Sequence, residues 1–365
     1  MSNSNTESDS QKVYEEPEGL DLQMDKGFAY PLDSLLIRPE QRTVYEIMRR
    51  IDKKAYILDP DFQRDFVWKE DRQSRLIESV LMRIPLPVFY LAEQDSGKII
   101  VVDGLQRLMT FRRYLKDEFS LKIPKSKLNG KKFSSLPQQY QARIEDTNLI
   151  VYLIDSKVPE RARLDIFERV NSGIPLSRQQ MRNSLNNGPA TRWLKKQALS
   201  EIFLAATDGS LNPKTMRDRE VINRFCGFFL LGYTKYSDDM DDFLASTLVY
   251  MNQFDEAKLN ELETTFLRSM KNNLIIFGKH SFRKHNSVNS KRSVINIALF
   301  DVMSCIMTKY STDFVKKHAT QFQQKFYILM NNPTFLASIT LATNDLPRVL
   351  SRFELAEEIF TELKE

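Results

Sequence analysis

The residues best placed for chemistry lie around a glycine at position 104. Residues 98–103 (KIIVVD) predict a buried strand that ends at Asp103, and Gly104 allows a tight turn into a helix that begins at Leu105. Open sheets bind ligands at the carboxyl ends of their strands, and the first amides of a helix attract phosphate. Asp103 would hold Mg²⁺ or orient a water, and Arg107 would neutralise a phosphate. In the alternative interpretation, Asp103 caps the helix and Arg107 is a surface charge.

The helix that follows Gly104 is predicted to have two distinct faces. Its apolar face would carry Leu105, Leu108, Met109 and Leu115. The opposite face would then present Gln106, Arg107 and Thr110. The segment lacks the G-x-x-x-x-G-K spacing of a Walker loop, so its assignment depends on the segments that accompany it.

A second polar cluster follows a short predicted strand, in DPDFQRDFVW at residues 59–68. Pro60 forces a bend there, and Gln63 and Arg64 would be presented rigidly to a ligand between two aromatic residues. The alternative is a strand-to-helix turn in which Asp65 is the cap and Trp68 anchors the core.

A third cluster lies in FERVNSGIPLS at residues 167–177, where one helix ends and another begins. Gly173 would supply the positive φ that ends the first helix. Arg169 and Asn171 would line a cleft, although a plain helix–turn–helix junction explains the same pattern.

A fourth segment, residues 278–293 (GKHSFRKHNSVNSKRS), is basic and contains no acid. We expect it to contact the phosphate backbone of DNA, or else to be a solvated basic loop. Its basic residues are Lys279, Arg283, Lys284, Lys291 and Arg292.

Composition excludes several classes of protein. No window approaches 18 uninterrupted apolar residues, which excludes a membrane helix, and the first twelve residues lack the features of a secretory signal. Cys226 and Cys305 lie in apolar surroundings, which indicates buried thiols in a reducing compartment, so we expect a cytoplasmic protein. Three histidines are too few to favour a zinc site. Residues 27–365 carry a net charge of +10, which permits an anionic partner.

Hydrophobic periodicity predicts an α+β domain followed by an all-helical domain. Residues 1–27 are acidic and show almost no apolar periodicity, which predicts a disordered tail. Residues 28–180 would form the α+β domain and residues 181–365 the helical one. In the α+β domain we expect helices over 32–51, 70–84, 105–115 and 159–170, and strands over 55–59, 86–93, 98–103 and 148–155.

Four segments in this order and spacing resemble one family. They are DPDFQRDFVW, LIESVLMRIPLPVFYL, VVDGLQRLMTF and IFERVNSGIPLSRQQMRN. Together they look like the N-terminal domain of GmrSD-type restriction systems, a member of the ParB/sulfiredoxin-like superfamily. Later segments, such as MRDREVINRF and INIALFD, resemble the helical half of single-module members, so the resemblance covers residues 34–310.

The resemblance implies a ParB-like mixed fold, and it implies nucleotide binding and hydrolysis at a D-G-Q-Q-R-type motif. The positions that match the family's motifs are Asp103, Gly104, Gln106 and Arg107, then Phe62, Gln63 and Arg64, and finally Arg169, Val170 and Asn171. Three positions depart from the pattern, namely Leu105, Ile174 and Gln180. No segment resembles the His-Asn-His nuclease half that often accompanies the domain, so cutting DNA would need the motifs above or a separate partner.

Three functions follow as hypotheses. The first is a Mg²⁺-dependent hydrolase or sensor of nucleoside triphosphates that acts with DNA in bacterial defence against phage, with a separate nuclease or methyltransferase as partner. The second is a non-catalytic DNA-binding or adaptor module that uses the same cleft. The third is a nuclease whose active site lies in the ParB-like half.

Overall fold

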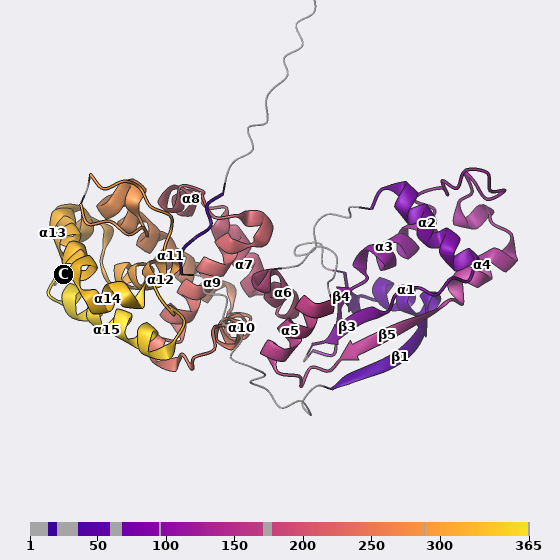
Figure 1. The fold of residues 1–365 in the computed structure, drawn as a ribbon, viewed down its shortest axis with the longest axis horizontal. Helices are drawn as coiled ribbons and strands as arrows, with labels where there is room; N and C mark the ends of the chain where they lie inside the picture. Colours follow the sequence, from indigo (N-terminus) through magenta and orange to yellow (C-terminus); the bar gives the residue numbers. More distant parts are fainter. Residues whose placement is uncertain are drawn as a thin grey trace, which may run out of the picture. The chain divides into compact units, whose positions relative to one another are not determined.

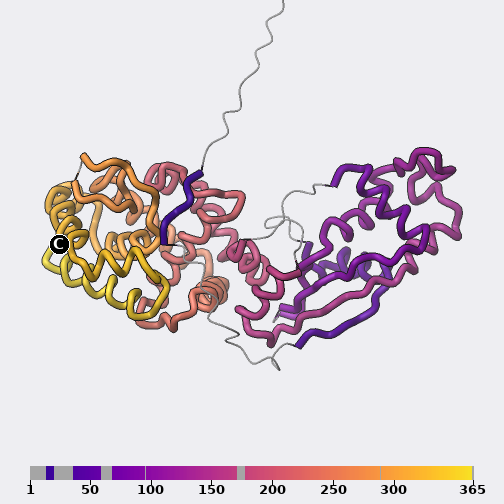
Figure 2. The backbone as a smooth tube through the Cα atoms, viewed as in Figure 1, coloured from indigo at the N-terminus to yellow at the C-terminus, as the bar shows by residue number. Residues whose placement is uncertain are grey.

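The computed structural model describes residues 14–19, 36–58, 68–94, 96–170, 177–287 and 289–363. The chain forms two compact units (Figures 1 and 2). One unit comprises residues 26–187, and the other combines residues 1–25 with residues 188–365. The fold class is therefore as predicted, an α+β domain followed by a helical unit.

The α+β domain is built on a five-stranded mixed sheet with the order β1-β5-β3-β4-β2. β1 and β5 are antiparallel, β5 and β3 parallel, β3 and β4 antiparallel, and β4 and β2 parallel. The strands span Ile37–Thr43 (β1), Tyr56–Ile57 (β2), Phe89–Glu93 (β3), Ile99–Asp103 (β4) and Asn148–Ile154 (β5).

Helices cover both faces of this sheet (Figure 1). In β4, Ile99 and Val101 pack on one face while Ile100 and Val102 pack on the other, as the period of two in a strand requires. The first face is covered by α1 (Val44–Asp52), α2 (Glu70–Leu81), α3 (Leu105–Leu115) and α4 (Gln138–Glu145). The second is covered by α5 (Glu160–Val170) and α6 (Arg178–Leu185).

The sequence prediction was wrong at the start of this domain. Apolar residues at helical spacing predicted a helix over 32–51, but residues 37–43 form β1 and only Val44–Asp52 is helical. All seven residues of β1 pair with β5, so tertiary pairing overrides the local pattern. Pro39 is tolerated because β1 lies at the edge of the sheet. The sequence also gave no sign of α4.

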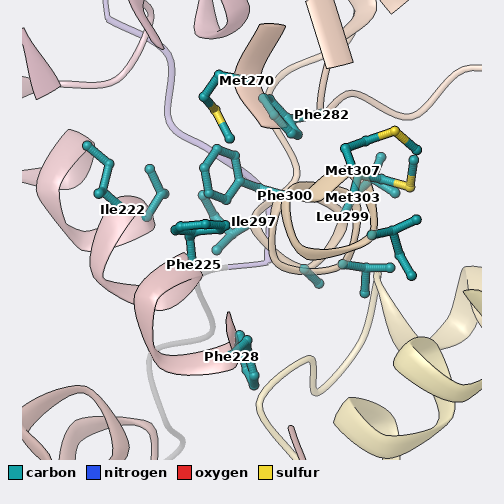
Figure 3. Close-up of a cluster of buried hydrophobic side chains, with 14 of the residues drawn as sticks. Ile222, Phe225, Phe228, Met270, Phe282, Ile297, Leu299, Phe300, Met303 and Met307 are labelled. Atoms are coloured by element: carbon teal, nitrogen blue, oxygen red, sulfur yellow. The ribbon is translucent and has the colours of Figure 1, made fainter. Parts of the chain in front are cut away.

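The helical unit surrounds a large apolar core that is drawn in Figure 3. α12 is buried on every side, with Ile297, Leu299 and Phe300 all at 0% exposure, so it is the central helix of the unit. The helices are α7 (Pro189–Ala198), α8 (Glu201–Thr207), α9 (Arg217–Leu230), α10 (Met240–Met251), α11 (Glu256–Phe277), α12 (Ile297–Ile306), α13 (Thr312–Asn331), α14 (Pro333–Ser338) and α15 (Leu346–Thr361). Among the described helices, none is long and apolar enough to cross a membrane.

Three fully buried charged residues tie α9, α12 and α15 together. Asp301 accepts hydrogen bonds from Arg224 Nε at 2.9 Å and Nη2 at 2.6 Å, and from Arg352 Nη2 at 3.1 Å. Burial lowers the pKa of Arg352 to about 10, and Asp301 opposes that shift. A carboxylate shared by two buried arginines must stay in place, because without it two charges would lie unpaired in the core.

Residues 14–19, which we call the N-terminal strap, lie on the helical unit although they fall within the predicted disordered tail. Glu18 forms an isolated parallel bridge with Asn296, and the amide of Glu15 donates to the carbonyl of Ser210 at 3.0 Å. The indigo segment in Figure 2 follows this course against the helices. Glu15 and Glu18 of the strap are paired with basic side chains, which composition alone does not reveal.

We predict that Asp301→Ala destabilises the helical unit by about 3–5 kcal/mol, because it leaves two buried guanidiniums without their carboxylate. Urea unfolding followed by circular dichroism measures this. The matched control is Asp313→Ala, which removes a side chain that is 94% exposed and should cost less than about 1 kcal/mol. Equal effects of the two substitutions would contradict the proposed importance of the buried cluster.

We also predict that the stability of the helical unit depends on the ionisation of Asp218. Burial raises the pKa of Asp218 from its ordinary value of 3.8 to about 6, against hydrogen bonding and attraction from Arg219. A raised pKa favours the folded state at low pH, and this contribution is lost as pH rises through about 6. Asp218→Asn should therefore stabilise the protein at pH 8 by up to about 3 kcal/mol, with a gain that shrinks toward pH 4. Unfolding at several pH values tests this, and a gain independent of pH would contradict it.

Candidate functional site at the end of β4

A β-bulge and a left-handed glycine set the direction of the chain where β4 ends. Tyr90 pairs with Asp103 but Leu91 pairs with Val101, so β4 contains one extra residue just before Asp103. Bulges of this kind commonly re-aim a side chain beside a functional site. Gly104 follows with φ +101° and is the N-cap of α3. Because glycine has no side chain, no side-chain cap competes for the first amides of the helix.

Gly104 is also required by packing. A Cβ built on Gly104 would lie 2.4 Å from Cδ1 and 2.9 Å from Cε1 of Phe89, which is 1% exposed. The backbone of the turn therefore passes directly over the ring of Phe89 in β3. The site depends on this close approach as well as on the positive φ.

Arg107 is not the solvent-facing phosphate ligand that the sequence predicted, because its guanidinium is buried and hydrogen-bonded within the domain. The residue is 8% exposed and donates to the carbonyls of Pro87 and Val88, the latter at 3.0 Å, and to Asp103 Oδ2 at 2.7 Å. Its guanidinium lies 4.2 Å from the centre of the Phe89 ring. Burial lowers the pKa of Arg107, and Asp103 opposes that shift. Arg107 thus clamps the segment before β3 to the end of β4.

The prediction for the faces of α3 was wrong for the same reason. Its most buried residues are Arg107, Leu108, Thr110, Phe111 and Tyr114, whereas Leu105, Met109 and Leu115 are only half-buried. The apolar pattern allowed both assignments, since leucines lie on both faces. The aromatic residues Phe111 and Tyr114 decide between them, because both are completely buried.

Asp103 remains partly accessible at the edge of the sheet. Its side chain is 34% exposed, and Oδ2 is held by Arg107. The alternative interpretation, that Asp103 caps the helix, is not what the structure has, since Gly104 occupies the N-cap. Asp103 is therefore an oriented carboxylate at the carboxyl end of a buried strand.

Gln106 connects this turn to the end of the second polar cluster. Its Oε1 accepts a hydrogen bond from the amide of Trp68 at 3.3 Å, while Gln73 Nε2 donates to the carbonyl of Trp68 at 2.7 Å. Arg113 Nη1 in turn donates to Gln73 Oε1 at 3.0 Å. Gln106 thus positions the backbone at the start of α2, a role that the sequence did not predict.

The other predicted cleft residues are only partly described. Gln63, Arg64 and Asn171 lie outside the described residues. β2 precedes the first two and runs parallel to β4, so its carboxyl end lies at the same edge of the sheet as Asp103. Arg169 is exposed in the last turn of α5.

Residues 44–186 match a family model described as the GmrSD restriction endonuclease, N-terminal domain. This segment is a GmrSD N-terminal domain. The match covers the sheet strands from β2 to β5 and helices α1 to α6, so it includes the whole Asp103 turn. A domain of this family indicates a restriction-type defence module. No curated protein matches the chain significantly.

The GmrSD domain also contains a buried polar face that sequence reasoning missed. Gln179, Arg182 and Asn183 in α6 are each at most 5% exposed, and Gln179 bonds to both of the others. In α5, Arg163 is 7% exposed and donates to the carbonyl of Glu93 at 3.0 Å. The sequence signal that could have indicated this face is the placement of polar residues at positions i, i+3 and i+4 of one helix. They place a polar network on the face of the sheet opposite α3.

The basic stretch outside the GmrSD domain divides into buried and exposed residues. Arg283 is 1% exposed and bonds to Glu15, to the carbonyl of Ser293 and to Ser210, so its predicted contact with DNA is wrong for this conformation. Lys284 and Arg292 pair with acids of the strap. Lys279 and Lys291 are exposed and form no ion pair with the described residues.

The described residues fit a magnesium ion delivered with a nucleotide better than a resident one. Among them, no three carboxylate, thiol or imidazole groups gather closely enough to hold a metal. Asp103 offers one carboxylate, and Mg²⁺ in nucleotide sites is commonly held by one or two carboxylates together with phosphates and waters. The predicted metal ligand Asp103 is thus compatible with this type of site.

We predict that Gly104→Ala destabilises the GmrSD domain by about 2–5 kcal/mol, from backbone strain and the clash with Phe89 combined. Gly97→Ala is the matched control, because Gly97 also has positive φ (+73°) but its added Cβ would meet nothing within 4 Å. We expect the control to cost only about 1–2 kcal/mol. Thermal unfolding of both variants measures the difference, and equal losses would show that the contact with Phe89 is unimportant.

Proposed function

We propose that the GmrSD domain of this chain binds and hydrolyses a nucleoside triphosphate at the carboxyl end of β4. The observation that carries this proposal is the turn itself, in which an oriented carboxylate precedes a left-handed glycine and an uncapped helix start. Anions bind readily at such helix starts, and a nearby carboxylate can hold the metal that accompanies a triphosphate.

In this proposal Asp103 is the catalytic residue and Arg107 is a positioning residue. Arg107 fixes Oδ2 of Asp103, and Oδ1, which has no hydrogen bond to the described residues, would bind the metal or orient a water. The amides at the start of α3 would bind phosphate oxygens. Mg²⁺ bound with the nucleotide would neutralise phosphate charge, while Gln106 holds Trp68 and thereby the start of α2.

Of the phosphate ligands that the sequence indicated, Arg107 takes a different role in this proposal. Arg107 already has an acid and two carbonyls as partners, so it would stabilise the turn and not the transferred phosphate. Gln63, Arg64, Arg169 and Asn171 remain candidates from the motif matches, and they would supply the positive charge and polar contacts that Arg107 does not.

DNA is the proposed partner, since restriction-type defence acts on DNA. Lys279 and Lys291 are exposed cations of the basic stretch that form no ion pair with the described residues, and such an interaction would be built from them. Cleavage would fall to a separate nuclease, with a methyltransferase as the other expected partner. Binding of nucleotide or DNA without turnover would favour the adaptor function instead, and metal-dependent nicking lost with Asp103→Ala would favour a nuclease.

We predict that Asp103→Ala lowers phosphate release from nucleoside triphosphates at least about 100-fold, because the mutant loses the group that orients metal or water. The assay measures phosphate from a panel of triphosphates with Mg²⁺, with and without DNA. Asp52→Ala is the matched control, since it removes an acid that pairs with Lys116 near the opposite end of α3. The control should retain full turnover.

Circular dichroism establishes that both variants are folded. Unchanged turnover in folded Asp103→Ala would remove this residue from the mechanism. If the wild-type protein releases no phosphate under any condition, hydrolysis is excluded and nucleotide binding should be measured directly by equilibrium dialysis.

A further inference from the structure

The N-terminal strap lies in a groove of the helical unit that we call the strap groove, formed by Ser210, Arg283, Lys284, Arg292, Ile295–Ile297 and Thr343. Backbone groups recognise the strap along its length. The Glu18 amide donates to the Ile295 carbonyl at 2.8 Å, and the Ile297 amide donates back to the Glu18 carbonyl at 2.9 Å. Thr343 Oγ1 donates to the carbonyl of Gly19 at 2.8 Å. These are the contacts by which an extended peptide adds a strand to a protein.

The groove is also selective for an acid at position 15. Glu15 Oε2 lies 2.6 Å from Arg283 Nη1, and Oε1 lies 2.8 Å from Arg292 Nη1. Burial of Glu15 opposes ionisation, but the two arginines lower its pKa overall. Arg283 also bonds to the carbonyl of Ser293 and to Ser210, and these groove residues hold its charge in position independently of the strap. This is a preorganised carboxylate site.

Two further positions of the strap are recognised by side chains. Glu18 pairs with Lys284 and accepts a hydrogen bond from Asn296 Nδ2 at 3.3 Å. Tyr14 is one wall of a cavity of about 120 Å³ in the helical unit. The other apolar residues that line it include Leu199, Phe203, Leu204, Leu211 and Pro213. The strap thus offers two acids with basic partners and, directly before the first acid, an aromatic residue beside an apolar cavity.

We propose that the strap groove is a docking site for an extended acidic peptide with an aromatic anchor, and that residues 14–19 are its resident, displaceable ligand. A partner protein that carries such a segment would bind by displacing the strap. The contacts favour peptide over nucleic acid, because the groove pairs with the backbone amide and carbonyl of an extended segment. This proposal does not depend on nucleotide hydrolysis by the GmrSD domain.

The first test exchanges a charge pair in the full-length chain. Glu18 and Lys284 are 31% and 25% exposed, so both can be substituted without burying a charge. We expect amide hydrogen exchange of residues 14–19 to speed up at least about tenfold in Glu18→Lys and in Lys284→Glu, and to return toward the wild-type rate in the double variant. Lys279→Glu is the matched control, because Lys279 lies in the same basic stretch without contacting the strap. Protection that survives both single substitutions would overturn the proposal.

The second test adds a fluorescent peptide of residues 11–20 (QKVYEEPEGL) to full-length protein. The tethered strap competes at an effective concentration in the millimolar range, so wild-type protein should bind the peptide at least about tenfold more weakly than the Glu18→Lys variant does. Replacing the acid at position 15 of the peptide by alanine should weaken binding to this variant about 30-fold or more. Absence of peptide binding to Glu18→Lys would overturn the proposal. Release of the strap by a DNA duplex but not by the peptide would likewise overturn it, in favour of a nucleic-acid site.

Discussion

The Arg107 guanidinium is the interaction on which the candidate site depends. It joins the carbonyls before β3, the ring of Phe89 and the carboxylate at the end of β4, and it does so from the first turn of α3. Position 104 requires a glycine, because the backbone of the turn passes so close to the Phe89 ring that a Cβ would clash with it. Bulge, turn, helix start and carboxylate are therefore fixed relative to one another by one buried charge, which is costly to bury but fully paired.

The contacts of Arg107 change the role that the motif assigns to this arginine. An arginine three residues after a glycine at a helix start looks like a phosphate ligand, and the sequence was interpreted in that way. In the structure the arginine holds the carboxylate, so in the proposed function the turn would bind phosphate through backbone amides and not through a side-chain cation. Discrimination between nucleotides would then come from segments next to the turn, one of which is held by the hydrogen bond between the Trp68 amide and Gln106.

Much of the fold could be predicted from the sequence, because long periodic segments with clear stops decide their own structure. β4, α3 and β5 follow from apolar patterning, and the order of motifs identifies the family. β1 could not be predicted, since its pairing with β5 lies in residues more than 100 positions away. Arg107 and Arg283 were misjudged for a related reason. A charged side chain is assumed to be solvated unless its partners are known, and the partners of these two are backbone carbonyls and distant acids.

The strap makes the helical unit discontinuous in sequence, since residues 14–19 belong to it while the GmrSD domain lies between them and residue 188. Glu15 and its partner Arg283 are 268 residues apart in the chain. During synthesis the strap leaves the ribosome first but cannot dock until the α11–α12 connection has emerged. The strap is thus among the last parts of the helical unit to dock, and until then other molecules can reach both the strap and its groove.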